Sequence, residues 1–231
     1  MIDPGALSSI REGIDRARKR AGLEDAPPVE IVAVTKGFPK EAIDSAYRAG
    51  LRSIGETRVQ EAGEKMDRLP ELPGLTLRMI GHLQSNKARK GVSLFDTIDS
   101  VDSVKLGKRI SRIASQQRTV MPVLLQVNTG GDPAKFGFSL NDVGDLIELV
   151  HLPGIRVEGL MTIGALTTDT EETRRTFRRL RQLRDQLNEQ LAPGVRLHHL
   201  SMGMTADFKI AVEEGATMVR IGTALFGPRP A

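Results

Sequence analysis

The sequence contains no cysteine and no tryptophan, and tyrosine occurs once among 231 residues. The missing cysteine excludes disulfides, thiolate metal sites and a cysteine nucleophile, and it favours a reducing compartment. No run approaches the roughly 18 apolar residues that a membrane-spanning helix needs. The N-terminal segment carries charge from Asp3 onward and has no apolar stretch, so no secretion signal is expected. These absences together predict a cytoplasmic protein without membrane association.

Aromatic residues are scarce, at 3% of the chain, although the net charge is +4. Basic patches attract phosphate backbones, but binding of single strands also needs aromatic platforms. The arginine-rich stretch from Arg174 to Arg184 contains one aromatic residue. Apolar residues recur through and beyond this stretch at helical spacing, at Phe177, Leu180, Leu183, Leu187 and Leu191. We therefore interpret the arginines as the solvated face of an amphipathic helix and expect no nucleic acid partner.

Short β-branched apolar segments recur along the chain, and each is followed by a longer helical pattern. This alternation is typical of βαβ units that build a parallel sheet. The expected strands lie at Glu30 to Thr35, Arg52 to Gly55, Leu77 to Gly81, Thr97 to Ser100, Val123 to Asn128, Arg156 to Ile163, Leu197 to Ser201 and Met218 to Gly222. The expected helices lie at Ser8 to Ala21, before the first strand, and at Pro39 to Ala49, Thr57 to Leu69, Gln84 to Gly91, Ser103 to Arg118, Leu140 to His151, Thr170 to Gln190 and Met204 to Gly215.

Eight strands with interleaved helices close naturally into a barrel, whereas an open doubly wound sheet usually has fewer strands and a glycine-rich first turn. Several expected strands have only four or five residues, so a count of seven fits the same sequence. The proline-containing segments Asp25 to Val29 and Leu69 to Thr76 are too short to separate domains. We predict an α/β fold, a (β/α)8 TIM barrel that forms a single domain over residues 1–231 with an extra N-terminal helix.

Active sites of such barrels lie at the carboxyl ends of the strands, so reactive residues that end a strand are the candidates. Lys36 directly follows the first expected strand. This position places an amine at the mouth of the barrel, although a rim lysine commonly forms only a surface salt bridge.

Two glycine-containing segments follow the seventh and eighth strands, from Leu200 to Asp207 and from Arg220 to Gly227. Each offers a hydroxyl group, and the first also leads into a helix start with free backbone N–H groups, which are features that bind phosphate. Barrel enzymes frequently bind phosphate between these two loops, although glycines also suit plain tight turns.

An amine opposite a phosphate site suits a ligand with an aldehyde and a phosphate tail, because the amine condenses with the aldehyde while the tail fixes it. Pyridoxal 5′-phosphate (PLP) has both groups. A Schiff-base aldolase meets the same requirements, so both interpretations stay open on this evidence.

Six motifs spread over nearly the whole chain, at Val32 to Lys36, Ile54 to Glu56, Ile80 to Lys87, Gly159 to Gly164, Leu200 to Asp207 and Val219 to Gly227. In these motifs the sequence resembles the YggS/PROSC family of pyridoxal phosphate homeostasis proteins, whose barrel is similar to the N-terminal domain of alanine racemase. The resemblance implies a PLP-binding barrel of fold type III that acts in intracellular PLP homeostasis.

The resemblance also implies roles for individual residues. Lys36 would carry PLP as a Schiff base. The phosphate would be bound by Ser201, Gly203, Gly222 and Thr223. Arg220 would face the pyridine nitrogen. Because a guanidinium stays protonated and only donates hydrogen bonds, Arg220 would keep that nitrogen unprotonated and weaken the ring as an electron sink.

Amino-acid racemisation needs two bases on opposite faces of the cofactor. In alanine racemase the second base is a tyrosine from an additional C-terminal domain, whereas this sequence stops at Ala231, just after the eighth expected strand. The one tyrosine, Tyr47, lies in a helix expected outside the barrel. We therefore favour a non-catalytic PLP-binding protein over a cryptic PLP-dependent racemase or lyase, a Schiff-base aldolase, or an adaptor built on the basic helix.

The family implies, without pointing to any single residue, that the protein delivers PLP to PLP-dependent apoenzymes. A monomer is expected because the domain that builds the racemase dimer is missing from the sequence. No metal site is expected, and the motifs leave the roles of His82, Met161 and Lys135 open.

Overall fold

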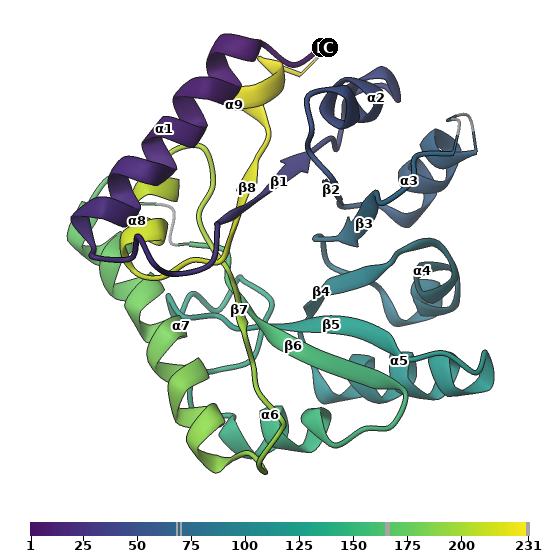
Figure 1. Ribbon diagram of the computed structural model, residues 1–231. Helices are drawn as coiled ribbons and strands as arrows, with labels where there is room; N and C mark the ends of the chain where they lie inside the picture. The colour runs from purple at the N-terminus through teal and green to yellow at the C-terminus, as the bar shows by residue number, and fades with distance from the viewer. Residues whose placement is uncertain (68, 70, 165–166, 230–231) are drawn as a thin grey trace.

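The computed structural model describes residues 1–67, 69, 71–164 and 167–229. Its strands β1 to β8 pair in chain order as a closed parallel barrel, in which β8 returns to β1, and helices surround this barrel (Figure 1). The strands are β1 (Glu30–Val34), β2 (Ser53–Glu56), β3 (Thr76–Met79), β4 (Thr97–Val101), β5 (Met121–Gln126), β6 (Ile155–Met161), β7 (His199–Ser201) and β8 (Met218–Ile221). The helices are α1 (Pro4–Arg20), α2 (Glu41–Arg48), α3 (Val59–Met66), α4 (Ala88–Leu94), α5 (Val104–Gln116), α6 (Val143–Val150), α7 (Thr170–Gln190), α8 (Phe208–Glu213) and α9 (Thr223–Phe226), with a 3-10 turn η1 (Ser85–Lys87) before α4.

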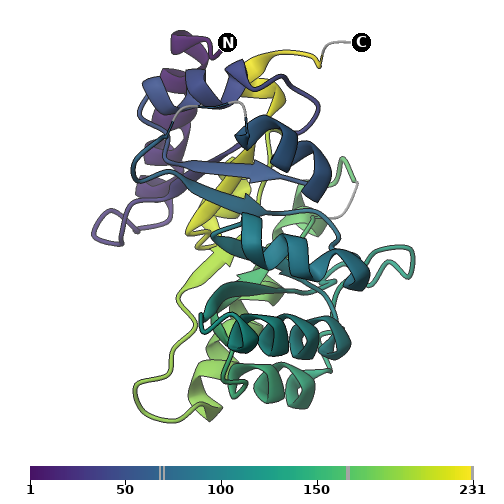
Figure 2. The ribbon, with the colours of Figure 1, turned by 90° about the vertical axis from the view of Figure 1, so that its right-hand side faces the viewer.

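The predicted barrel is confirmed, because each of the eight expected strands is present within two residues of its predicted ends. A count of seven strands is therefore wrong. The turned view shows α4, α5 and α6 stacked one after another along the outside of the strands (Figure 2). The expected helix and connection around residue 69 include Arg68 and Pro70, which lie outside the described residues, as does Ala231.

Helix ends agree less well with the prediction, although α7 matches at both ends. Helix α1 begins at Pro4 instead of Ser8, because the Asp3 side chain accepts a hydrogen bond from the Gly5 N–H at 2.9 Å and proline suits a first helical turn. Helix α8 begins at Phe208, four residues later than expected. The Asp207 carboxylate instead accepts a hydrogen bond from the N–H of Met204 and holds this segment as a turn. The expected helix at Gln84 to Gly91 is η1 followed by α4, and α9 is not among the predicted helices.

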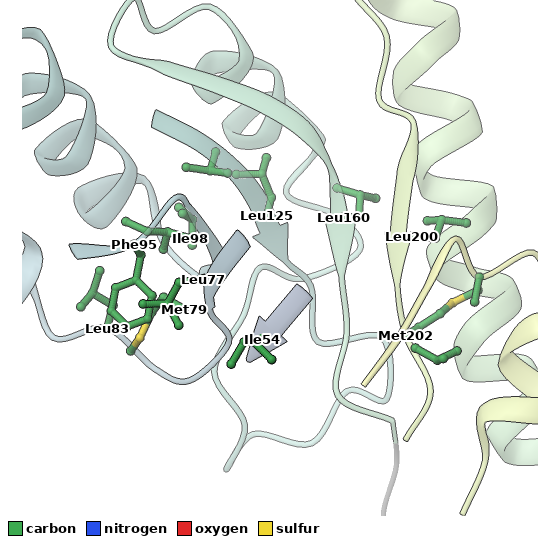
Figure 3. Close-up of a cluster of buried hydrophobic side chains, with 14 of the residues drawn as sticks. Ile54, Leu77, Met79, Leu83, Phe95, Ile98, Leu125, Leu160, Leu200 and Met202 are labelled. Carbon is green, nitrogen blue, oxygen red and sulfur yellow. The ribbon is translucent and has the colours of Figure 1, made fainter. Parts of the chain in front are cut away.

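Two buried layers pack on the two faces of the strands. The outer layer lies between strands and helices, and Figure 3 shows part of it, where Leu83 and Phe95 pack beside Leu77 and Met79 of β3. The inner layer consists of strand residues alone, Val32, Leu124, Met161 and Met218. Since side chains alternate along a strand, the inner layer fills the barrel interior. Where both faces of a strand are apolar, as in the centres of β1 and β5, the strand reads as a continuous hydrophobic run.

A polar group lies in the same interior, next to the apolar inner layer. Arg78 of β3 is buried and donates to Ser53 Oγ at 2.6 Å. Its guanidinium also lies 3.3 Å from the carboxylates of Asp99 and of Glu30. Ion pairs therefore occupy the barrel interior toward the end where β1 and β2 begin with Glu30 and Ser53.

The arginines of α7 are only partly the solvated face that the sequence predicted. The apolar residues of the helix are buried as expected. Arg174, Arg178 and Arg181, however, all form ion pairs with Glu214, whose side chain is 5% exposed, at 3.2, 3.0 and 3.4 Å. The reason is that Glu214 follows α8, which packs beside α7. Among the described residues, no helix is both long and apolar enough to cross a bilayer.

Candidate functional site

A tight turn of residues Thr35 to Phe38, which we call the lysine turn, follows β1 at the carboxyl end of the barrel. The Phe38 N–H donates to the Thr35 carbonyl at 3.0 Å, and Gly37 has a φ of +71°. Glycine adopts this left-handed conformation without strain, so the chain can reverse directly after the lysine. Lys36 lies where the sequence predicted it, at the end of the strand, and its side chain is half-buried.

The amine of Lys36 is surrounded by more positive than negative charge. Burial lowers the pKa of Lys36, and the guanidinium groups of Arg229, Arg220 and Arg58 lower it further, while Glu56 acts in the opposite direction. A lowered pKa increases the fraction of neutral amine near neutral pH. The neutral amine is the nucleophile, so Lys36 is better suited than an ordinary lysine to attack an aldehyde.

The loops after β7 and β8 lie side by side at the same end of the barrel, as the sequence predicted. Gly203 has a φ of +91°, and a Cβ atom there would lie 2.5 Å from the Cβ atom of Ala211 in α8. Gly222 precedes α9, and the Oγ1 atom of Thr223 lies 3.4 Å from that of Thr205 in the neighbouring loop. The two loops therefore approach each other closely enough for their threonine hydroxyls to lie within hydrogen-bond distance.

Arg220 joins the two loops from the barrel interior. Its side chain is buried, and Nη1 donates to the carbonyl oxygen of Ser201 at 2.7 Å and to Ser201 Oγ at 2.9 Å. Nη2 donates to the Thr162 carbonyl at 2.7 Å. Burial lowers the pKa of Arg220 to about 10, with Asp99 and Asp207 opposing the shift, so the group stays protonated at neutral pH. Ser201 accepts from Arg220 and keeps its own O–H free to donate.

Three residues without an assigned role also find their places. Met161 fills the inner layer of the barrel and is fully buried. His82 Nδ1 lies 2.6 Å from Asp102 Oδ2, and its ring stacks on Phe136 with a centroid distance of 3.9 Å. Lys135 Nζ donates to the Gly164 carbonyl at 2.9 Å. The described part of the chain contains no cluster of three potential metal ligands.

Sequence reasoning missed a buried ionic group directly behind the lysine turn. Lys65 of α3 lies 2.8 Å from Glu56 and 2.7 Å from Glu61. Glu56 ends β2, so the rule that places reactive residues at strand ends could have found it. Lys65 has no such signal, because a lysine in an amphipathic helix usually faces solvent.

Comparison with known proteins identifies close relatives over the full length of the barrel. The family model for the N-terminal domain of alanine racemase matches residues 6–230. A protein from Aquifex aeolicus (strain VF5), named pyridoxal phosphate homeostasis protein, is 41% identical over 224 residues, which cover 96% of this chain and 96% of the relative. A protein of the same name from Pseudomonas aeruginosa is 40% identical over 230 residues, which cover 96% and 97%.

Solved structures show the same barrel. The structure of PipY from Synechococcus elongatus PCC7942 with PLP bound superposes with a TM-score of 0.81 at 43% identity, covering 91% of this chain and 99% of that chain. An alanine racemase from Clostridium difficile 630 superposes with a TM-score of 0.78 at 20% identity, covering 100% of this chain and 58% of that chain. The second likeness concerns the fold alone, because the identity is low.

Proposed function

The chain belongs to the alanine racemase N-terminal-domain family, in agreement with its YggS/PROSC resemblance, and from this membership we propose that it holds PLP covalently on Lys36 and acts in PLP homeostasis. The observation that carries the proposal is the half-buried amine at the barrel mouth, whose pKa is lowered by burial and by three arginines. PLP supplies an aldehyde that condenses reversibly with an amine, together with an anionic phosphate. A strand-end amine within a positive field fits both groups.

The loops after β7 and β8 would hold the phosphate through Ser201, Gly203, Gly222 and Thr223. Two features support this assignment. Glycine at position 203 lets the loop approach α8 more closely than any side chain would allow, and the hydroxyl groups of Thr205 and Thr223 lie 3.4 Å apart between the two loops. The exposed hydroxyl of Thr223 would reach the ligand from the solvent side.

Arg220 would donate to the pyridine nitrogen of PLP. The guanidinium of Arg220 is buried, and none of the described residues places a carboxylate within hydrogen-bond distance of it. Its positive charge is therefore available to the site. A cationic donor at this nitrogen disfavours its protonation and thus weakens the ring as an electron sink. Such a site favours reversible storage of PLP over carbanion chemistry.

A non-catalytic role is supported by the position of the one tyrosine. The Tyr47 hydroxyl donates to the Pro73 carbonyl at 2.9 Å, and Arg52 stacks on its ring at 4.0 Å. Both contacts lie on the helical layer outside the barrel, so Tyr47 does not supply a second base. The proteins named above from Aquifex aeolicus and Pseudomonas aeruginosa carry the name of homeostasis proteins and not of enzymes.

We also propose a domain organisation, a compartment, an oligomeric state and a class of partner. Residues 1–231 would act as one PLP-binding domain and as a cytoplasmic monomer that releases PLP to PLP-dependent apoenzymes. Reversible imine chemistry supports release, because an incoming amine can displace Lys36. Size-exclusion chromatography with light scattering would test the monomer, and transfer of PLP to a purified apoenzyme would test delivery.

The decisive experiment is an absorbance spectrum of purified protein reconstituted with PLP, before and after borohydride, beside Lys36→Ala. We expect a visible absorption band that borohydride removes, with the reduced adduct found by mass spectrometry at Lys36. The variant should show neither. A wild-type protein that forms no adduct would exclude the proposal and favour the aldolase interpretation.

One observation favours a second candidate, a weak PLP-dependent activity. His82 is hydrogen-bonded to Asp102 through Nδ1, which leaves Nε2 as a base at the carboxyl end of the barrel. Exchange of the α-proton of amino acids in deuterated water would reveal such an activity. Exchange that exceeds that of free PLP and is lost in His82→Gln would establish it.

A further inference from the structure

The peptide groups on both sides of Lys36 are tied to one element, α3. The Thr35 carbonyl, directly before Lys36, accepts a hydrogen bond from Lys65 Nζ at 2.8 Å. The Gly37 N–H, directly after Lys36, donates to Glu61 Oε1 at 2.7 Å. Two side chains four residues apart on one helix face therefore hold the backbone that carries the amine.

These two side chains form a compact ionic group with Glu56. Lys65 Nζ lies 2.8 Å from Glu56 Oε1 and 2.7 Å from Glu61 Oε1. With the Thr35 carbonyl, this makes three acceptors for the three protons of the ammonium group. Glu56 Oε1 also accepts from the Thr35 hydroxyl at 2.6 Å. We call Glu56, Glu61 and Lys65 the turn clamp, because every bond named here ends on the lysine turn or within the group.

The turn clamp is buried in a way that stability alone does not explain. The side chains of Lys65 and Glu56 are 9% and 0% exposed, and Glu56 Oε2 is buried without a hydrogen-bond partner in the described residues. Burial raises the pKa of Glu56 against the effect of its bonds to Lys65 and Thr35. A buried ion pair commonly stabilises no more than apolar residues of the same volume would. We therefore relate the turn clamp to the position of the lysine turn and not to the stability of the fold alone.

The lysine turn also makes an aromatic contact. The ring of Phe38 lies 5.2 Å from that of Phe226, which ends α9. Since α9 begins beside Gly222, this contact joins the turn to the loop that would hold the phosphate. The turn clamp and this aromatic pair together define how far the amine stands from that loop.

We propose that Lys65 is a positioning residue for Lys36, and that with Glu56 and Glu61 it fixes the lysine turn so that the amine points at the loops after β7 and β8. The proposal rests on the proposed function in one respect, that Lys36 is the residue which holds PLP. Removal of the clamp loosens the turn, which slows capture of an aldehyde and speeds its release.

Glu61 gives the sharpest test, because its side chain is 25% exposed and because Lys65 keeps its ion pair with Glu56 when Glu61 is replaced. We compare Glu61→Ala with Glu61→Gln, which keeps an acceptor for the Gly37 N–H. Glu64→Ala is the matched control, since Glu64 lies on the same helix, is exposed, and among the described residues its side chain bonds to that of Gln60 alone. Lys65→Met removes the ammonium group in a second, independent variant.

Three measurements are made on each folded variant, and two of them need no PLP. They are amide hydrogen exchange at Gly37 and Phe38 by NMR, acylation of Lys36 by a small reagent followed by mass spectrometry, and the dissociation rate of PLP. Loss of a charge-assisted hydrogen bond is worth about tenfold or more in an equilibrium. We therefore expect Glu61→Ala and Lys65→Met to speed exchange at Gly37 about tenfold or more, to change the acylation rate of Lys36, and to speed PLP release.

Glu61→Gln should fall between wild type and Glu61→Ala, and Glu64→Ala should match wild type. If Glu61→Ala and Lys65→Met both leave exchange at Gly37, acylation and PLP release as in wild type, the clamp has no positioning role. If both variants change exchange and acylation while wild type binds no PLP, the clamp stands and the proposed function fails. A change confined to the melting temperature, with all three readouts unaltered, would reduce the group to a structural ion pair and overturn the proposal.

Discussion

Replacing Gly203 by alanine perturbs both the backbone and the packing of the loop after β7. Gly203 has a φ of +91°, where an L-residue is disfavoured by about 1–2 kcal/mol. The added Cβ atom would lie 2.5 Å from the Cβ atom of Ala211 and 3.0 Å from the Cα atom of Phe208, both in α8. Such overpacking typically destabilises by about 1–3 kcal/mol, because backbone must move. We expect Gly203→Ala to lower the free energy of unfolding by about 2–5 kcal/mol, which corresponds to a fall in Tm of about 4–20 °C.

Gly194→Ala provides a matched control for this variant. Gly194 has a φ of +89°, and a Cβ atom there meets nothing within 4 Å. It therefore carries the backbone penalty of about 1–2 kcal/mol without the clash. Thermal unfolding followed by circular dichroism measures both variants, and equilibrium dialysis measures their affinity for PLP. Equal losses of Tm would refute the packing part of the reasoning, and unchanged PLP affinity in Gly203→Ala would refute the place of this loop in the phosphate site.

Three further predictions follow from charges in the barrel. After burial, Arg229 is the largest influence that lowers the pKa of Lys36, so Arg229→Ala should raise that pKa and move borohydride-trapped PLP incorporation to higher pH; an unmoved pH profile would contradict this. Asp99→Asn removes the buried carboxylate that pairs with the guanidinium of Arg78 and leaves it the partly exposed Glu30, so it should destabilise by up to about 3–5 kcal/mol in urea unfolding, whereas Arg78→Met with Asp99→Leu should recover most of the loss. Although burial alone would raise the pKa of Glu214, arginines of α7 lower it, so its stabilising effect is fully present above the ordinary carboxyl pKa. The stability difference between wild type and Glu214→Gln should shrink below that pH and be lost as pH falls through the lowered pKa of the folded state.

The number and order of strands could be predicted because each strand of a parallel barrel is buried on both faces. In β1, Ile31 and Ala33 face the helices while Val32 faces the interior, so the strand reads as one apolar run. Helix starts could not be predicted as well, since they depend on single side-chain bonds. Asp207 accepts from the Met204 N–H and delays α8, a choice that the residue types alone leave open.

The positions of the candidate site residues could be predicted where they follow from the order of the strands. They could not be predicted where they depend on how helices and side chains pack. Lys36 and the glycine loops end strands, and barrel topology brings strand ends together. Lys65 and Arg78 could not be assigned in this way, because the first depends on how α3 packs on the lysine turn and the second on which face of β3 points inward. Long charged side chains are uncommon in protein interiors, so the sequence alone would predict that Lys65 and Arg78 are exposed to solvent.

If Lys36 holds PLP as proposed, the same positive field explains both why the site would capture an aldehyde and why it would be poorly suited to carry chemistry further. Arg220, Arg229 and Arg58 lower the pKa of Lys36 together with burial, and the neutral amine that results condenses and exchanges readily. Arg220 is fixed by the carbonyl groups of Ser201 and Thr162, and none of the described side chains offers it a carboxylate at hydrogen-bond distance. In the proposed complex it would present a permanent cation to the pyridine nitrogen, and a ring that stays unprotonated withdraws electrons weakly. Arg220→Glu would reverse that charge, and a gain of α-proton exchange with amino acids in this variant would show that the arginine restrains the chemistry; loss of PLP binding without any such gain would show that it serves only to hold the ligand.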